Sequence, residues 1–154
     1  AVPVGRFLLD LHSSGEEARK CTDRLCIALQ ILNHLQDCKS DYLELDRVYL
    51  PQDFFNEQNI DVTALAESFS KPELRLVFDA LLDRINGMIK VARLELHNIK
   101  DKRLRFETAV ILLIAKALSK KLSKKDPIAQ NVKLSKLKKS LCILIGIWHG
   151  LKTF

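Results

Sequence analysis

The sequence predicts an all-α protein, a helical bundle folded as one compact unit. Glycine and proline are scarce, with five and four residues among 154, which disfavours a turn-rich β fold. Apolar residues recur at intervals of three and four over long stretches, and the alternation typical of strands does not occur. The length, with 47% hydrophobic residues, is sufficient to bury a real core.

The first third of the chain predicts two helical segments. Residues 4–11 are apolar, and we expect them to end a helix that begins before Ala1. After a break at 13–15, where Ser14 is placed to act as a cap, a helix is expected from about residue 16 to about residue 41. Its inward positions follow the helical spacing: Leu25, Ala28, Leu29, Leu32 and Leu35.

The middle of the chain predicts a connector and then a long helix. Residues 43–51 form the connector, because Pro51 stops regular structure there, and residues 52–70 are expected to form short helical pieces and loops. Pro72 suits the first turn of a helix over about 71–99, with Ser70 before it as a candidate cap. The expected apolar stripe comprises Leu74, Val77, Phe78, Leu81, Leu82, Ile85, Met88 and Ile89.

Two more helices are expected in the last third. The first runs over about 103–124 and is ended by Asp126 and Pro127, and the second covers about 134–149. The expected inward residues of the first are Phe106, Val110, Leu113, Ile114, Ala117 and Leu118.

The charge of the chain is unevenly distributed. Residues 1–99 hold 11 basic and 16 acidic residues, a net charge of −5, whereas residues 100–154 hold 14 and 3, a net charge of +11. A basic half favours an anionic partner, such as nucleic acid, a membrane surface or a phosphorylated ligand. The alternative is a solvated helical surface that is rich in lysine.

One helix carries a polar stripe. Gln30, Asn33, Asp37 and Asp41 are spaced three, four and four residues apart, which places them on one face of the 16–41 helix, close to His34. Two carboxylates one turn apart can share Mg²⁺, which prefers oxygen ligands and bridges to phosphates. The alternative is that both aspartates simply face solvent near the end of the helix.

Three segments carry a resemblance to a known family. Residues 29–41 (LQILNHLQDCKSD) resemble the second aspartate-rich motif of the squalene/phytoene synthase family, and residues 46–51 (DRVYLP) resemble its R-x-Y-L-P segment. Residues 3–6 (PVGR) resemble a segment that lies before this motif. The pair Gln36–Asp37, together with residues 3–6, is most similar to bacterial hydroxysqualene synthases of hopanoid pathways.

This resemblance implies an isoprenoid-synthase-type fold and a prenyl diphosphate substrate, farnesyl or presqualene diphosphate. Mg²⁺ held by Asp37 and Asp41 would bind the diphosphate and stabilise it as a leaving group. The candidate substrate-binding residues are Gln30, Asn33, Arg47 and Tyr49. For Arg47 the alternative is an ion pair with Asp46 or Glu44, and for Tyr49 it is packing of the connector.

The chain departs from the family in one respect. The family's first acidic motif, expected upstream of residues 3–6, is not found, so residues 1–154 resemble the C-terminal part of one prenyl-synthase domain. Asp79 and Asp83 share the spacing of the metal motif but follow it, and we expect them on the polar side of their helix. We therefore expect the isolated chain to be inactive and to self-associate through exposed apolar surface.

A second hypothesis is a non-enzymatic basic module that binds a membrane surface or nucleic acid. Lysines cluster at 120–125 and 133–139, before the apolar run 141–148, a pattern that fits peripheral contact with a membrane. Nucleic acid is not expected as a partner, because aromatic residues are not interleaved with the lysines. We expect a cytoplasmic protein, with the inner face of the membrane as its alternative location.

Overall fold

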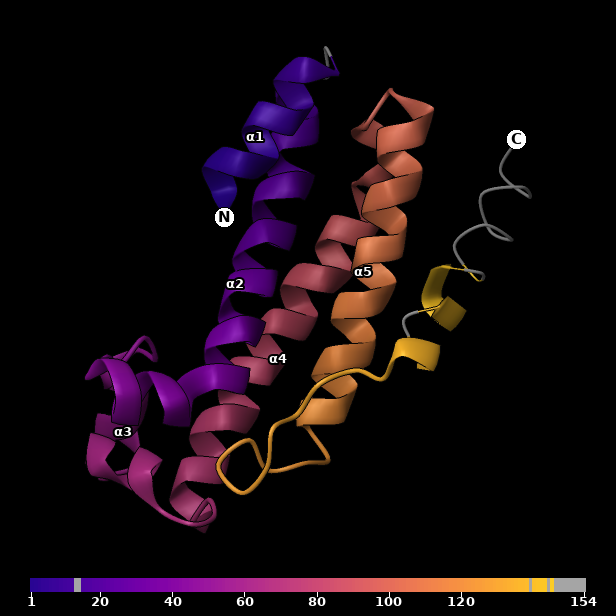
Figure 1. The fold of residues 1–154 in the computed structure, drawn as a ribbon. Helices are drawn as coiled ribbons and strands as arrows, with labels where there is room; N and C mark the ends of the chain where they lie inside the picture. Colours follow the sequence, from indigo (N-terminus) through magenta and orange to yellow (C-terminus); the bar gives the residue numbers. More distant parts are fainter. Residues whose placement is uncertain (13–14, 139, 144, 146–154) are drawn as a thin grey trace.

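The chain is all-α, as predicted (Figure 1). The computed structural model describes residues 1–12, 15–138, 140–143 and 145, and none of these residues lies in a strand. The helices of residues 1–122, as far as the structure describes them, are α1 (Val2–Leu11), α2 (Glu16–Leu45), α3 (Gln52–Glu57), η1 (Val62–Ala66), α4 (Pro72–Leu94), η2 (Leu96–Asn98) and α5 (Lys102–Leu122), where η denotes a short 3-10 helix.

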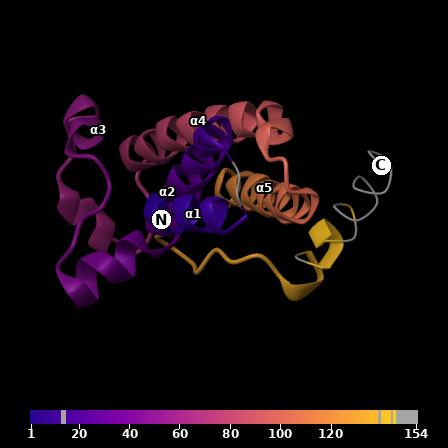
Figure 2. The same ribbon diagram turned by 90° about the horizontal axis from the view of Figure 1, so that it is seen from above.

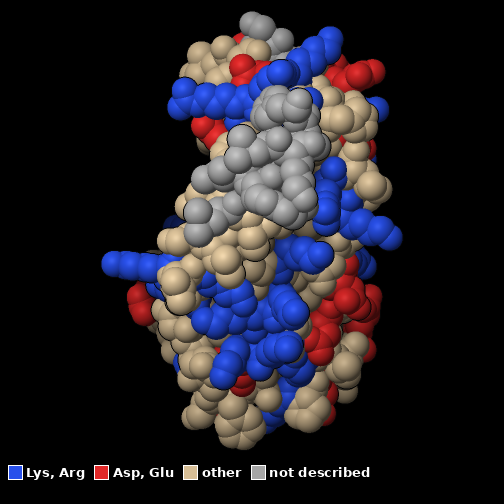
Figure 3. Space-filling model, turned by 90° about the vertical axis from the view of Figure 1, so that its right-hand side faces the viewer, with Lys and Arg blue, Asp and Glu red and all other residues tan. Residues whose placement is uncertain are grey.

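The three long helices form the body of the molecule. α2 contacts both α4 and α5, and α4 and α5 contact each other (Figures 1 and 2). α1 packs on the N-terminal half of α2, whereas α3 lies at the opposite end of the bundle (Figure 1). Lys and Arg side chains gather over the face of the molecule that carries α5, as the charge distribution of the sequence predicts (Figure 3).

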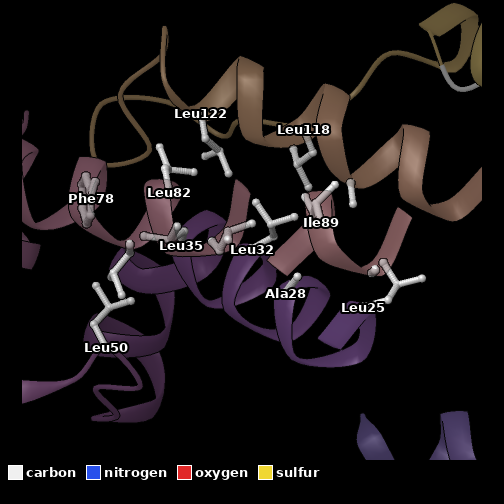
Figure 4. Close-up of a cluster of buried hydrophobic side chains, with 14 of the residues drawn as sticks. Leu25, Ala28, Leu32, Leu35, Leu50, Phe78, Leu82, Ile89, Leu118 and Leu122 are labelled. Atoms are coloured by element: carbon white, nitrogen blue, oxygen red, sulfur yellow. The ribbon is translucent and has the colours of Figure 1, made fainter. Parts of the chain in front are cut away.

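The core lies between α2, α4 and α5. Leu25, Ala28, Leu32 and Leu35 of α2 face α4 and α5, as Figure 4 shows. All four are buried, and the neighbouring Leu29 is half-buried against the same cluster. The predicted stripe of α4 is likewise buried, apart from the half-buried Met88. Periodicity therefore predicted the inward faces of both helices.

The face of α5 was predicted only in part. Val110 and Leu118 are buried, but Phe106, Leu113, Ile114 and Ala117 are only half-buried. The buried face instead comprises Leu104, Thr108, Val110, Leu112, Ala115, Leu118, Ser119 and Leu122. The reason is that residues 109–115 are apolar without interruption, so that stretch gives no periodic signal.

The helix ends differ from prediction by a few residues. α2 continues to Leu45 rather than 41, and α4 ends at Leu94, with η2 in place of its predicted last turn. The N-cap of α4 is Lys71, while Ser70 donates its hydroxyl to the Asp126 carboxylate. Asp101 caps α5, since its carboxylate accepts from the backbone N–H of Leu104 at 2.7 Å.

The predicted helix over 134–149 lies partly outside the described residues. Residues 136–138, 140–143 and 145 are helical, while 139, 144 and 146–149 are not described. The cap predicted at Ser14 also falls outside the described part of the chain. Between α5 and residue 136 the chain runs without regular structure past the C-terminal half of α2 (Figure 1).

Candidate functional site

The polar stripe lies on the outward face of α2. Gln30, Asn33 and Asp37 are exposed, and Asp41, one turn after Asp37, is half-buried. The stripe is opposite the buried leucines of the same helix, so the amphipathic pattern of α2 places it on the surface. The two carboxylates are therefore open to a ligand from solvent.

The backbone reverses direction directly after this stripe. Asp46, the C-cap of α2, adopts a left-handed conformation with φ 51° and ψ 46°, and the backbone N–H of Arg47 donates to the carbonyl of Asp41 at 3.1 Å. Aspartate tolerates this conformation better than most residues, so it suits a helix end. The turn brings residues 47–49 back alongside the stripe.

A chain of contacts joins the returning segment to α2. The Tyr49 ring stacks on the His34 ring, with centroids 4.3 Å apart and planes 19° from parallel. His34 and Gln30 are hydrogen-bonded through their Nε2 atoms at 2.9 Å. The Arg47 Nη1 donates to the Tyr49 hydroxyl at 3.1 Å, so Gln30, His34, Tyr49 and Arg47 form one connected polar face.

Arg47 is oriented by Tyr49 and not by an acidic neighbour. Its hydrogen bond to Tyr49 is the main cause that raises the pKa of the guanidinium above its ordinary value, and the negative charge of Asp41 makes the smallest contribution. The alternative ion pair with Asp46 or Glu44 is not formed in the described structure. The exposed guanidinium of Arg47 keeps further donors for an anion. Tyr49 thus contacts His34 through its ring and Arg47 through its hydroxyl.

Asp37 borders a groove on the other side of the stripe. The groove has a volume of about 320 Å³ and lies between α2 and residues 127–131. Two side chains of α2 hold this second wall in place: Gln36 donates to the carbonyl of Val132, and the Lys39 ammonium donates to the carbonyl of Ile128 at 3.3 Å. The amide side chains of Gln130 and Asn131 line the groove opposite Asp37. Nothing in the sequence analysis predicted that residues 127–131 border the stripe.

The donor set fits a magnesium ion that has few protein ligands. Asp37 and Asp41 offer carboxylate oxygens one helical turn apart, and Mg²⁺ keeps several waters and binds substrate phosphates readily. Within the described residues, no group of three His, Cys, Asp or Glu side chains converges on one point. The two aspartates would thus hold the metal from one side only.

Asp79 and Asp83 have the same spacing as Asp37 and Asp41 but lie on a different helix, α4, with different contacts. The Asp79 carboxylate accepts from the Nε of Arg75 at 2.9 Å on the half-buried flank of α4, and Asp83 is exposed one turn later. This arrangement agrees with the expected polar side of α4.

Comparison with known proteins decides the family. Residues 1–138 match the family model described as "Squalene/phytoene synthase". The chain belongs to the squalene/phytoene synthase family. The resemblance stated for residues 3–6, 29–41 and 46–51 is thereby confirmed, and the all-α architecture agrees with this family's helical fold.

Several individual members of the family are similar to this chain. The chain is 36% identical over 137 residues to hydroxysqualene synthase of Sinorhizobium fredii, which covers 89% of this chain and 47% of the relative. It is 39% identical over 134 residues to hydroxysqualene synthase of Rhodopseudomonas palustris, and this match covers 87% of this chain and 46% of the relative. Phytoene synthase of Thermus thermophilus is 29% identical over 108 residues, and this match covers 70% of this chain and 37% of the relative. No solved structure gave a significant match.

The chain spans about half the length of the hydroxysqualene synthases that it matches. Among the described helices, none has the length and apolar character needed to cross a membrane.

Proposed function

We propose that this chain is the C-terminal part of a prenyl-synthase domain that acts on farnesyl or presqualene diphosphate, with Mg²⁺ assisting the loss of diphosphate. The proposal depends most on one observation: the backbone N–H of Arg47 donates to the carbonyl of Asp41 at the end of α2, one turn from Asp37. The turn after α2 thus puts a guanidinium suited to phosphate oxygens on the segment that directly follows the carboxylates suited to a cation. Family membership and the similarity to hydroxysqualene synthases support this substrate class.

Each residue has a distinct role in this proposal. Asp37 and Asp41 would hold Mg²⁺, which when bound supplies positive charge to the diphosphate oxygens. Arg47 would bind the same diphosphate through its remaining N–H donors, and Tyr49 keeps its guanidinium in place. Gln30 and Asn33, further along the same face, would contact the substrate beyond the diphosphate. His34 fixes both Gln30 and Tyr49 by its two contacts.

Calorimetry with a non-hydrolysable farnesyl diphosphate analogue tests this site. The 154-residue chain is titrated with and without Mg²⁺, alongside Asp37→Asn/Asp41→Asn. We expect binding that requires Mg²⁺ and weakens at least tenfold in the double variant, because each lost carboxylate removes a charged ligand. Arg47→Gln should weaken binding while leaving some dependence on Mg²⁺.

The chain offers a matched control. Asp79→Asn/Asp83→Asn removes the same charge at the same spacing from α4, and it should leave binding unchanged. Binding without Mg²⁺, or equal losses in both double variants, would contradict the proposed site. Far-UV circular dichroism of each variant verifies that the helices remain folded.

We also propose that the isolated chain does not turn over substrate. Two carboxylates on one helix hold a metal from one side, whereas the resemblance implies a second acidic motif facing them. Measurable product from this chain alone, with Mg²⁺ and farnesyl diphosphate, would refute this part of the proposal.

Two further partners are proposed on other grounds. The net charge of +11 over residues 100–154 supports contact between the lysine-rich C-terminal segment and the inner face of a membrane, in a protein otherwise located in the cytoplasm. Binding of the chain to anionic but not to zwitterionic vesicles would test this contact.

Self-association is supported by apolar side chains that α1 leaves exposed, among them Val4, Phe7 and Leu11.

A further inference from the structure

A second groove lies between α4 and α5, and it is lined with positive charge. It has a volume of about 420 Å³ and is bordered by Lys90 and Arg93 of α4 and by Lys116 and Lys120 of α5. None of its lining residues is shared with the groove beside Asp37, so it is separate from the site on α2. One of its two helices, α5, belongs to the basic half of the chain, residues 100–154.

The four cations have no acidic partners within the part of the chain that the structure describes. Five arginines elsewhere in the described chain pair with carboxylates: Arg6, Arg19, Arg24, Arg75 and Arg103. Within the described residues, the charged groups of Lys90, Arg93, Lys116 and Lys120 form no ion pair and no hydrogen bond. The sequence excludes a nearby partner on either helix, because residues 84–94 and 108–125 contain no Asp or Glu.

The ends of the two helices explain only part of this charge. Basic residues in a last turn are favoured by the helix dipole, which accounts for Arg93 and Lys120. Lys90 and Lys116 lie before those last turns, on the sides of α4 and α5 that border the groove. Four like charges around one hollow create a positive potential that attracts an anion.

Uncharged donors line the same groove. The buried Ser119 donates its hydroxyl to the Asn86 Oδ1 at 2.8 Å, which leaves the amide nitrogen of Asn86 available as a donor. Ser123 also borders the groove, and the apolar side chain of Ile89 lines it. Ammonium, guanidinium and amide groups around one hollow are the donors that phosphate oxygens accept from.

We propose that the α4–α5 groove binds a phosphate-bearing anion, either free diphosphate or the phosphate of an anionic lipid headgroup. It does so without a metal ion, because the neutralising charge comes from Lys90, Arg93, Lys116 and Lys120. This inference does not depend on the function proposed for α2, and the two are separated by their requirement for Mg²⁺.

The test uses inorganic diphosphate in the presence of a chelator, which silences any site that needs Mg²⁺. Calorimetry compares the 154-residue chain with Lys116→Gln/Lys120→Gln and with Lys90→Gln/Arg93→Gln. The matched control is Lys124→Gln/Lys125→Gln, which removes the same charge just beyond α5 without touching the groove. All six positions are exposed, and glutamine keeps good helix propensity at the four helical ones, so folding is retained and checked by circular dichroism.

We expect diphosphate affinity to fall at least tenfold in both groove variants and less than twofold in the control. A second arm measures co-sedimentation with phosphatidylcholine vesicles that do or do not contain phosphatidylglycerol. Loss of vesicle binding in the groove variants, with free diphosphate not bound by any form, would assign the site to lipid headgroups and still support the proposal. Equal losses in groove and control variants, or no binding in either arm, would overturn it.

Discussion

Gly5 allows α1 to lie close against α2. A Cβ atom at this buried position would come within 2.7 Å of both the Cys26 Sγ and the Thr22 Cγ2. Real Cβ contacts are essentially never that short, so these side chains or one of the helices would have to shift. The glycine of residues 3–6 is thus needed for packing in this chain, whatever else that segment does.

Gly5→Ala should therefore destabilise the protein, by about 1–3 kcal/mol, because overpacking forces side chains and backbone to shift. Urea unfolding followed by circular dichroism measures the free energy of unfolding. Gly87→Ala is the matched control: no atom lies within 4 Å of its added Cβ, and it should stabilise the interior of α4 by about 0.5–1 kcal/mol. If Gly5→Ala also stabilises, the close approach of α1 to α2 is wrong.

The residues of the candidate site were predictable where they are local. The stripe from Gln30 to Asp41 follows from spacing on one helix, and the structure places it on one face. The wall held by Gln36 and Lys39 was missed because those hydrogen bonds join residues 96 and 89 positions apart. No pattern within one segment indicates such contacts. The stacking of Tyr49 on His34 was missed because it depends on the left-handed turn at Asp46.

The buried face of a helix could be predicted from the sequence where one side of the helix is apolar and the other is polar. α2 and α4 each have an apolar stripe opposite a polar face, so their buried faces were predicted closely. α5 is apolar all round over residues 109–115, so its rotation is set by α2 and α4 and not by its own sequence. α1 has a clear stripe too, but part of it faces outward: Val4, Phe7 and Leu11 are 64%, 62% and 64% exposed.

The exposed stripe of α1 predicts self-association of this chain. Val4, Phe7 and Leu11 are spaced as one helical face, and covering an exposed large apolar side chain contributes about 1.5–3 kcal/mol. We expect sedimentation equilibrium to detect dimers and Phe7→Glu/Leu11→Glu to raise their dissociation constant at least tenfold. Leu76→Glu/Leu94→Glu, which alters two exposed leucines of α4, is the control and should have little effect. A wild-type chain that stays monomeric at high concentration would contradict this expectation.

At the scale of the whole molecule, Asp126 ties the end of α5 to the start of α4. Its carboxylate accepts from the backbone N–H and the hydroxyl of Ser70, at 2.7 and 2.5 Å, and from the N–H of Ile128 at 2.9 Å. The segment after Asp126 forms the second wall of the groove beside Asp37. A single carboxylate thus links the packing of two core helices to the geometry of the candidate site.

This link predicts a dependence of stability on pH. Partial burial raises the pKa of Asp126, but the hydrogen bonds from Ser70 and the backbone outweigh it, so its pKa is lowered overall. A carboxyl group with a depressed folded-state pKa stabilises the fold above its unfolded pKa of about 3.9 and loses that contribution as pH falls through the folded value. Asp126→Asn should cost about 1–2 kcal/mol at pH 7, with a smaller cost at pH 3.

Urea unfolding of both proteins from pH 7 to pH 3 isolates this contribution. Asp61 and Asp101 also have lowered pKa values, from hydrogen bonds donated by the backbone N–H groups of Thr63 and Leu104, and both remain in the variant. Their effect therefore cancels in the difference between wild type and Asp126→Asn. Asp83→Asn, at an exposed position, controls for the loss of one negative charge. A difference that stays constant below pH 4 would mean that Asp126 does not carry the link, and the wall beside Asp37 would then depend on Gln36 and Lys39 alone.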